Sequence, residues 1–387
     1  MKEILFELVA GMDIENVRKM INKEFTIKKQ KIKEYLESKS LSGILLTKRS
    51  NYSWITCGCR NKIIDASELG ASSILFFKDI FYLITTNIEI ERMISEELNN
   101  FISVEKVIYD WFNPKGLKES VKKIIGLKKI VQDYPLIEEV DVVGSEFNYL
   151  KFELTPQEIS RFVELGQTVS KCVTSVCFDI NPGITEFELQ GNLSNLLISN
   201  EIMPLVILIG SDDRIFKYRH PLPTKKKIEK YIMVVAGAEK WGMIAAITRF
   251  VHFGALDTHL EKIKEHTMQI DANMILNSKS GIKYNEIFER AMFNYDKLGY
   301  NNEWRNHHQG GPLGYESRYL LVNSDTKMNI RENHAIAWNP SITGFKSEDT
   351  FIVGKEKNLI ITEDKNWPKI EIKTEYGKIL RPDILIR

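Results

Sequence analysis

The chain has few cysteines, almost no net charge and no long hydrophobic run, and each absence argues against a class of protein. Only 4 of 387 residues are cysteine, and 53 lysines and arginines balance 52 aspartates and glutamates to a formal net charge of +1. The spacings of Cys57, Cys59, Cys172 and Cys177 suit neither a disulfide framework nor a zinc knuckle. A near-neutral chain lacks the electrostatic attraction that draws basic proteins to nucleic acid or to anionic membranes.

No segment reaches the roughly 18 uninterrupted apolar residues that a membrane-spanning helix requires. Residues 1–8 interrupt their apolar side chains with charged ones, and no small-residue cleavage site follows, which argues against a secretory signal. We therefore expect a cytoplasmic protein with packed, reduced thiols, no membrane partner and no nucleic-acid partner. Hydrophobic residues make up 43% and charged residues 27% of the chain, a mixture typical of a globular protein with two or three domains.

The predicted elements fall into two parts, residues 1–153 and 154–387. In the first part, apolar runs at 43–47, 73–77 and 80–85 alternate with helical periodicity, which predicts an α/β domain. The boundary is marked by Thr155-Pro156-Gln157-Glu158, which combines a threonine cap, a proline at the first helical position and a glutamate three residues after the cap.

The second part repeats a pattern of two helices followed by two strands. Helices are expected at 155–178 and from Thr185 onward, then at 255–278 and 285–298; strands are expected at 204–209, 231–236, 241–253, 335–338 and 350–353. This duplicated layout predicts an α+β domain whose helices cover one face of a curved antiparallel sheet.

Four stretches carry residues suited to chemistry. His220 lies in a polar loop before Pro221, and Thr248 and Arg249 interrupt an apolar strand. Asn306–Arg318 combines His307 and His308 with two glycines, Tyr315, Glu316 and Arg318, and the last stretch carries Asn339 and Glu348. Each has a plainer reading: a surface histidine, a structural ion pair for Arg249, a loop, and a Glu348 that simply pairs with a lysine.

In this order the motifs resemble those of the creatinase, prolidase and aminopeptidase P family. The family's helix start resembles Pro182–Glu186, its strand pair resembles Val235–Arg249, its glycine-rich histidine motif resembles His307–Glu316, and its last motif resembles Asn339–Asp349. His220 stands where the family has a histidine before the first metal strand. The resemblance implies an N-terminal α/β domain and a C-terminal catalytic domain with the pita-bread fold.

The metal ligands of that family are mostly missing here. Its metallopeptidases hold two divalent ions with two aspartates, one histidine and two glutamates. The aspartate positions are occupied by Val235 and Ala246 and one glutamate position by Asn339, which leaves His308 and Glu348. We therefore expect no catalytic metal pair and no cofactor.

The resemblance to creatinase, which acts without metal, implies roles for the remaining residues. His220 would be the general base and then the acid, His308 would orient the substrate, and Glu348 would bind a cationic or N–H-rich group. The further substrate contacts that we expect are Arg249, Thr248, Tyr315, Asn339, Glu316, Arg318 and Trp54.

These roles predict a metal-independent hydrolase that cleaves a C–N bond in a small amide, amidine or guanidino substrate. The alternatives are an Xaa-Pro metallopeptidase, a lyase on the same scaffold, and a non-catalytic ligand-binding relative. The resemblance also implies a homodimer, for which the aromatic residues of a predicted loop at 51–54 would supply contacts.

Overall fold

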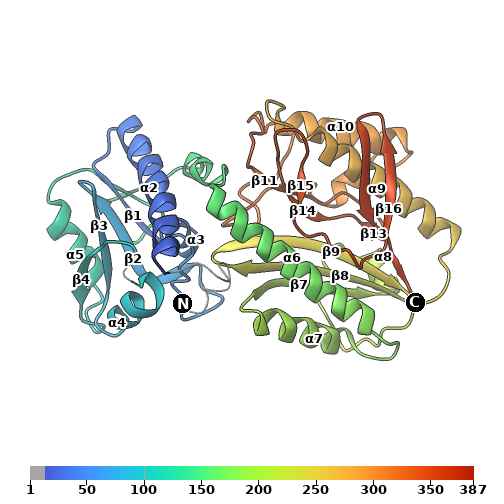
Figure 1. The fold of residues 1–387 in the computed structure, drawn as a ribbon, viewed down its shortest axis with the longest axis horizontal. Coiled ribbons are helices and arrows are strands. Elements are labelled where there is room, and N and C mark those ends of the chain that lie inside the picture. The colour runs from blue at the N-terminus through green and yellow to red at the C-terminus, as the bar shows by residue number, and fades with distance from the viewer. Residues whose placement is uncertain (1–13, 100) are drawn as a thin grey trace. The chain divides into compact units, whose positions relative to one another are not determined.

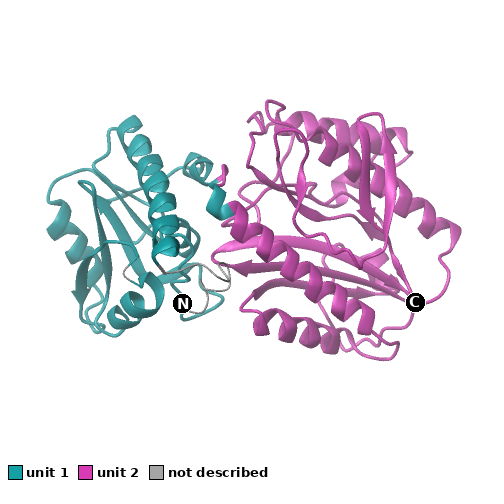
Figure 2. Cartoon of the chain, in the orientation of Figure 1, with its two compact units in different colours: residues 1–151, 155–158 teal, residues 152–154, 159–387 magenta. Residues whose placement is uncertain are grey.

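The computed structural model describes residues 14–99 and 101–387, which form two compact units. Unit 1 comprises the described residues up to Lys151 together with Thr155–Glu158, and unit 2 comprises Phe152–Leu154 and Ile159–Arg387 (Figure 2). Among these residues no helix is both long and apolar enough to cross a bilayer.

Unit 1 is an α/β unit built on a six-stranded sheet with the order β4-β3-β2-β1-β5-β6 (Figure 1). The strands are β1 (Gly43–Lys48), β2 (Leu69–Phe77), β3 (Ile80–Thr86), β4 (Glu105–Tyr109), β5 (Val131–Gln132) and β6 (Asp141–Val142). The helices are α2 (Ile14–Ser38), α3 (Arg49–Ile55), α4 (Ile90–Arg92), a π-helical turn η1 (Met93–Leu98), α5 (Gly116–Ile125) and a 3-10 helix η2 (Ser145–Lys151). The predicted hairpin is confirmed, because β2 pairs antiparallel with β3 across Lys78 and Asp79.

The predicted loop at 51–54 is wrong, because these residues belong to helix α3. Tyr52 is completely buried and Trp54 is 1% exposed. The indole of Trp54 packs edge-on against Phe147 of the same unit at a ring distance of 6.1 Å. A buried indole is unavailable to a substrate or to another subunit, so Trp54 is a core residue, and the expected homodimer loses the contacts on which it was argued.

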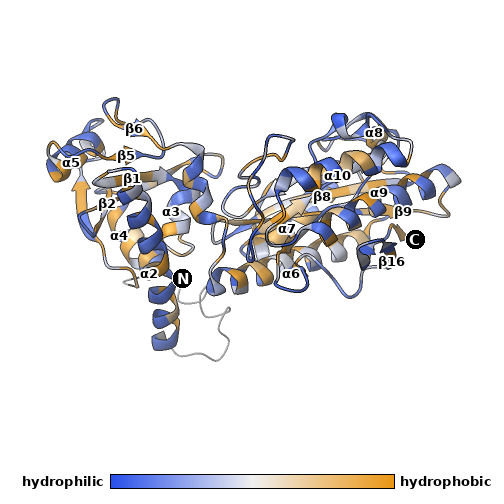
Figure 3. Cartoon of the chain, turned by 90° about the horizontal axis from the view of Figure 1, so that it is seen from above, coloured by the Kyte–Doolittle hydropathy of each residue, from blue (hydrophilic) through white to orange (hydrophobic). Residues whose placement is uncertain are grey.

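Unit 2 begins with two helices that lie along a four-stranded sheet. They are α6 (Pro156–Asp179) and α7 (Glu186–Ser199), and the sheet has the order β18-β9-β8-β7. Its strands are β7 (Met203–Ser211), β8 (Tyr231–Lys240), β9 (Met243–His252) and β18 (Leu385–Ile386). The predicted start of α7 is confirmed, since Thr185 and Glu188 form a reciprocal capping box. Every residue of β8 and β9 is buried, and both strands carry mostly hydrophobic residues (Figure 3).

A second sheet of unit 2 has the order β10-β11-β14-β15. Its strands are β10 (Gly310–Pro312), β11 (Ala335–Trp338), β14 (Asp349–Ile352) and β15 (Leu359–Ile360), and the pair β12 (Ser341–Ile342) and β13 (Phe345–Lys346) lies between β11 and β14 in the chain. The helices of this half are α8 (Asp213–Lys217), α9 (Thr258–Asn277), α10 (Tyr284–Lys297) and a 3-10 turn η3 (Glu303–Asn306). Helix α9 contacts α10 and a hairpin that the sequence did not predict, β16 (Lys369–Thr374) with β17 (Gly377–Pro382).

The two sheets of unit 2 meet where β9 runs beside β14. Thr248 donates its backbone N–H to the carbonyl of Glu348 at 3.1 Å, and Ala246 exchanges hydrogen bonds with the hydroxyl of Thr350 at 2.8 and 2.9 Å. The predicted α+β fold, with helices covering a curved and largely antiparallel sheet, is therefore present in unit 2.

Candidate functional site

The register of the second sheet gathers the predicted site residues at one end of three strands. Trp338 of β11 lies opposite Gly310 of β10 on one side and opposite Asp349 of β14 on the other. The residues just beyond this row are therefore neighbours, and Asn339 donates its backbone N–H to the carbonyl of Gln309 at 3.1 Å. His307 and His308 precede β10, and Glu348 precedes β14, so this strand end brings both motifs together.

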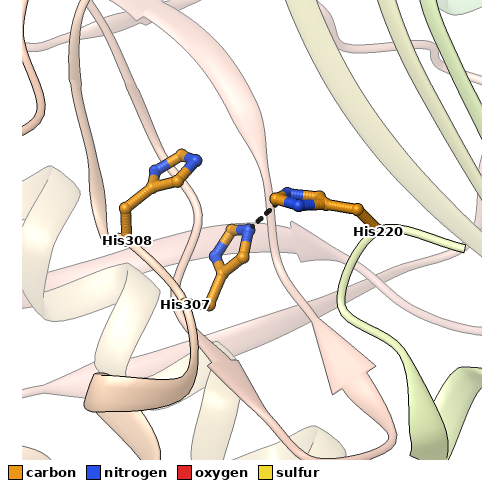
Figure 4. Close-up of side chains that lie close together, drawn as sticks. All are labelled: His220, His307 and His308. Carbon is orange, nitrogen blue, oxygen red and sulfur yellow. Dashed lines mark hydrogen bonds between the residues drawn. The ribbon is translucent and has the colours of Figure 1, made fainter.

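Three histidines converge at this end of the sheet. His220 and His307 approach through their Nε2 atoms, which lie 3.0 Å apart, and the rings of His307 and His308 stack at 4.4 Å (Figure 4). One ring nitrogen from each of the three histidines lies within 4.8 Å of the other two. His307 is buried, His308 is half-buried and His220 is exposed, so His220 is the imidazole that solvent reaches most easily.

The loop that carries His220 is held at both ends by one buried carboxylate. Glu186, at the start of α7, is completely buried and accepts hydrogen bonds from the backbone N–H groups of Ser211 at 2.8 Å and Thr224 at 3.0 Å. It also pairs with Arg214. Because residues 211 and 224 flank the loop, Glu186 fixes both of its ends to helix α7.

A second contact ties the middle of this loop to the segment of the other two histidines. Arg219 donates to Glu303 of η3 at 2.8 Å and to the hydroxyl of Thr343 at 2.7 Å. Glu303 also accepts the backbone N–H of Thr343 at 3.0 Å. Arg219, which directly precedes His220, therefore links this loop to the turn that leads into His307.

Glu348 lies beside the histidines with both carboxylate oxygens occupied. Its Oε1 accepts from Arg318 at 2.9 Å, and its Oε2 accepts from Lys346 at 2.9 Å and from the Thr248 hydroxyl at 2.6 Å. Burial opposes ionisation of this carboxyl, but Lys346 and Arg318 hold the pKa of Glu348 well below its usual range. The carboxylate is therefore ionised, and its charge is already balanced within the protein, which weakens the expectation that it binds a cationic substrate group.

The three imidazoles are held in their neutral form. Burial, reinforced by the Lys346 ammonium, lowers the pKa of His220 and brings the pKa of His307 to about 2. Burial and the Arg318 guanidinium bring the pKa of His308 to about 4. Neutral imidazoles are able to accept a proton or to act as ligands near neutral pH.

Of the predicted substrate-binding residues, Thr248 and Arg318 contact Glu348, whereas Arg249 does not belong to this cluster. Consecutive residues on a strand point to opposite faces, so Arg249 faces away from Thr248 and Glu348. Its guanidinium pairs with Asp349 at 2.9 Å and donates to the carbonyl of Thr362 at 2.8 Å, and its side chain is 3% exposed. The plainer reading, a structural ion pair, is therefore correct for Arg249.

The other predicted contacts lie on the segments that border the site. Asn339 is buried, and its Oδ1 has no hydrogen-bond partner within 14–99 and 101–387. Tyr315 is 2% exposed, and its backbone N–H donates to the hydroxyl of Tyr319 at 2.8 Å. Glu316 is half-buried, and its carbonyl accepts the backbone N–H of Gly314 at 3.1 Å.

Two residues that belong to this cluster were not assigned a role from the sequence. His307 was passed over in favour of its neighbour, because only one histidine of the pair matches the family motif. Lys346 was noticed only as a possible ion-pair partner of Glu348. The sequence could have pointed to both, because each lies within two residues of an expected site residue: His307 adjoins His308, and Lys346 precedes Glu348 by two residues.

The donor set does not suit the metal pair that the family resemblance implies. Val235 and Ala246 offer no ligand atom, and both oxygens of Glu348 are already held by Lys346, Arg318 and Thr248. Two dications need bridging carboxylates to balance their charge, and here an ammonium stands beside the remaining carboxylate. The three histidines do offer three nitrogen donors, a number found in mononuclear zinc sites.

Comparison with known structures gives the same fold over most of the chain. Xaa-Pro dipeptidase from Bacillus anthracis matches with a TM-score of 0.74 and 18% identity, over 94% of this chain and 100% of that chain. The prolidase from Pyrococcus horikoshii OT3 matches with a TM-score of 0.74 and 21% identity, over 87% and 98% of the two chains.

The fold also occurs in a protein that is not named as a peptidase. The N-terminal domain of FACT complex subunit SPT16 from Cicer arietinum (chickpea) matches with a TM-score of 0.69 and 12% identity, over 88% of this chain and 96% of that one. The search of curated protein sequences found no match. These likenesses confirm the predicted pita-bread fold.

Comparison of the sequence with models of protein families identifies the family to which the chain belongs. Residues 161–363 match metallopeptidase family M24, and this stretch contains all three histidines, Glu348, Lys346 and Arg318. Because the match covers more than half of the chain, it confirms the predicted kinship with creatinase, prolidase and aminopeptidase P. The chain belongs to metallopeptidase family M24.

Proposed function

We propose that the protein is a metal-independent hydrolase that cleaves a C–N bond in a small substrate, with His220 as the general base. One observation carries this proposal: an exposed imidazole, His220, lies 3.0 Å through Nε2 from the buried imidazole of His307. A neutral imidazole with one nitrogen held by a partner is the arrangement that general base catalysis uses.

The direction of that hydrogen bond follows from what a base requires. A neutral imidazole carries one N–H, so His220 keeps a free lone pair on Nδ1 only if its Nε2–H donates to His307. His307 then carries its own proton on Nδ1. When His220 takes up a second proton, His307 continues to accept from Nε2 and so stabilises the imidazolium.

In this scheme His220 accepts a proton from water while the water oxygen forms a bond to the substrate's electrophilic carbon. The electrons of the C=O or C=N bond move to its heteroatom, giving a tetrahedral anion. The anion then collapses, the C–N bond breaks, and the proton on His220 passes to the departing nitrogen. The step is balanced by water alone and needs no oxidant, reductant or metal-bound nucleophile.

The relatives of known structure support this choice of bond, since two of them are named as a prolidase and an Xaa-Pro dipeptidase. The neutralisation of the Glu348 charge by Lys346 and Arg318 argues against a guanidinium substrate held by that carboxylate. We therefore favour an amide or peptide C–N bond over the amidine or guanidino bonds of the original expectation.

A second candidate is a single-metal peptidase, and one observation favours it: the three imidazole nitrogens within 4.8 Å of one another. In that case His220 would be a ligand and not a base. The positive charges of Lys346 and Arg318 disfavour a dication there, since charges a few ångströms apart interact strongly in a partly buried site.

Turnover of a panel of dipeptides, N-acyl amino acids, ureido and guanidino compounds, with and without chelator, tests the proposal. We expect hydrolysis that chelator leaves unchanged, and His220→Gln to lower kcat by about 10²–10⁴-fold with little change in KM. His266→Gln is the matched control, because His266 lies on α9 and bonds to Tyr300 outside the cluster. Activity that chelator abolishes and Mn²⁺ or Zn²⁺ restores would instead establish the single-metal candidate.

A further inference from the structure

The ammonium of Lys346 has hydrogen-bonding capacity that the described residues do not use. Lys346 ends strand β13 and is 6% exposed. Within the described part of the chain its Nζ makes one hydrogen bond, to Oε2 of Glu348 at 2.9 Å. An ammonium carries three donors, so two remain in a nearly buried position.

The charges around Lys346 do not balance. Lys346 and Arg318 share a single carboxylate, Glu348, which leaves one positive charge in excess. The ion network behind it has no such excess, because Arg249 and Arg381 are balanced by Asp271 and Asp349. A buried charge without a counter-charge is costly, and a negatively charged ligand would relieve that cost.

The excess positive charge faces the histidine cluster. Lys346 precedes Glu348 by two residues at the strand end where Trp338 lies opposite both Gly310 and Asp349, and the neighbouring Ser347 donates its backbone N–H to the carbonyl of Pro340 at 3.1 Å. His307 and His308 precede β10 at this same strand end. The side chains of His220, His307 and His308 converge on one another from two separate segments (Figure 4). His307 and His308 each have a buried Nδ1 without a hydrogen-bond partner among the described residues.

We propose that Lys346 forms an anion-binding site beside the three histidines, and that it receives the substrate's carbonyl oxygen as this becomes an oxyanion. The catalytic part of this inference rests on the proposed function, because it assumes that His220 drives water onto an adjacent carbon. Lys346 then supplies the positive charge that a metal ion provides in metallohydrolases. It is fixed in place by Glu348 before the reaction begins, which is the condition for strong electrostatic stabilisation.

Anion binding can be measured without a substrate. We expect acetate, titrated at constant ionic strength with chloride, to raise the melting temperature of the wild-type protein and to give a saturable calorimetric signal. Lys346→Met should lose both responses and Lys346→Arg should keep them. The matched control is Lys264→Met, since Lys264 is also nearly buried and pairs with two carboxylates, Glu261 and Asp383, but lies outside the cluster.

Acetate binding that survives Lys346→Met, or its absence from the wild-type protein, would overturn the inference. Should Lys346→Met fail to fold, Lys346→Gln removes the positive charge, keeps a polar group at this position and leaves Glu348 paired with Arg318, so it answers the same question. Inorganic phosphate serves as a second probe; a response to phosphate alone would contradict a site shaped for a carbonyl or carboxylate oxygen.

The catalytic role has its own readout, which separates the two proposals. Loss of one oxyanion-stabilising donor lowers kcat by about 10²–10³-fold, so Lys346→Met should fall in that range with a smaller change in KM. Metal-independent turnover whose kcat is unchanged by Lys346→Met would refute the inference and leave the proposed function intact. Acetate binding that depends on Lys346 in a protein without turnover would refute the proposed function and leave the anion site.

Discussion

His220 and His307 form a hydrogen-bonded pair whose members differ in exposure, and this difference assigns their roles. The exposed ring of His220 can reach a substrate, whereas the ring of His307 is buried and hydrogen-bonded to His220. His308 stacks on His307 and has an orphaned Nδ1. In the proposed mechanism, one histidine of the cluster therefore acts on the substrate and the others hold it in place.

The rate should depend on pH through the base. His220 is active when neutral, and its pKa is lowered by burial and by Lys346, so kcat/KM should rise with pH through an apparent pKa below the ordinary histidine value of about 6.5. Lys346→Met removes a nearby positive charge and should move this rise of kcat/KM to higher pH. A pH–rate profile of both proteins checks the shift; a rise that moves to lower pH or stays fixed would contradict the placement of Lys346.

Glu348 should contribute to stability more than an exposed carboxylate does. Its pKa is lower in the folded than in the unfolded protein, so its contribution is fully present above the unfolded pKa, begins to decline below that value and is lost as the pH falls through the folded pKa. Glu348→Gln leaves two buried cations without a counter-charge, which should cost about 3 kcal/mol in unfolding free energy at pH 7. Urea unfolding at pH 7 and pH 4 measures the loss and its decline in acid.

The control for this prediction is Glu261→Gln. Glu261 pairs with Lys264 but is 53% exposed, so its loss should cost less than about 1 kcal/mol. Equal losses for the two variants would show that the Glu348 cluster is an ordinary surface ion pair.

At the scale of elements, one carboxylate at a helix start positions the loop of the catalytic base. Glu186→Gln replaces an acceptor oxygen with an NH₂ group, which would face backbone donors at Ser211 or Thr224. The loop should become less well fixed, and misplacement of a catalytic group by about 1 Å can cost 10²-fold in rate. We expect kcat to fall at least tenfold while KM changes less.

Glu188→Gln is the matched control, because Glu188 lies two residues further along the same helix and bonds to the capping Thr185. It should lower stability slightly and leave kcat unchanged. A loss of kcat as large as that of Glu186→Gln would mean that the integrity of helix α7, and not the loop contacts, sets the rate.

Elements with strong local signals were predictable from the sequence, and elements set by tertiary packing were not. The caps at Thr155 and Thr185 predicted the starts of α6 and α7 within one residue. Residues 51–54 were taken for a loop, although burial of Tyr52 and Trp54 stabilises helix α3 there. The hairpin β16–β17 mixes charged and apolar residues and pairs only with itself, so its pattern was weak.

The site was predictable where the family motifs retain chemically active residues. His220, His308, Thr248, Arg318 and Glu348 were all named, and the structure brings them and their neighbours together. The role of Glu348 was not predictable, because the neutralisation of its charge depends on Lys346 and Arg318 approaching from different segments. Arg249 was misassigned because strand alternation, which turns it away from Thr248, was not applied to it.

At the scale of the whole molecule, the chain has an M24 peptidase fold. Where the family resemblance implies two dications, this chain places a lysine and an arginine around one glutamate. Fewer than about one tightly held transition-metal ion per chain is expected, since three of five ligand positions carry no carboxylate or imidazole. Elemental analysis after dialysis checks the number, and two stoichiometric ions would contradict it.

The central claim is that this active site hydrolyses its substrate without a metal. The most direct test measures turnover of the best substrate from the panel in samples that span a range of metal content, from chelator-dialysed to Mn²⁺- and Zn²⁺-loaded, with metal per chain determined for each. The account predicts a rate per chain that does not depend on metal content and that Lys346→Met lowers throughout the series. A rate that rises in proportion to bound metal and vanishes in the chelated sample would contradict it.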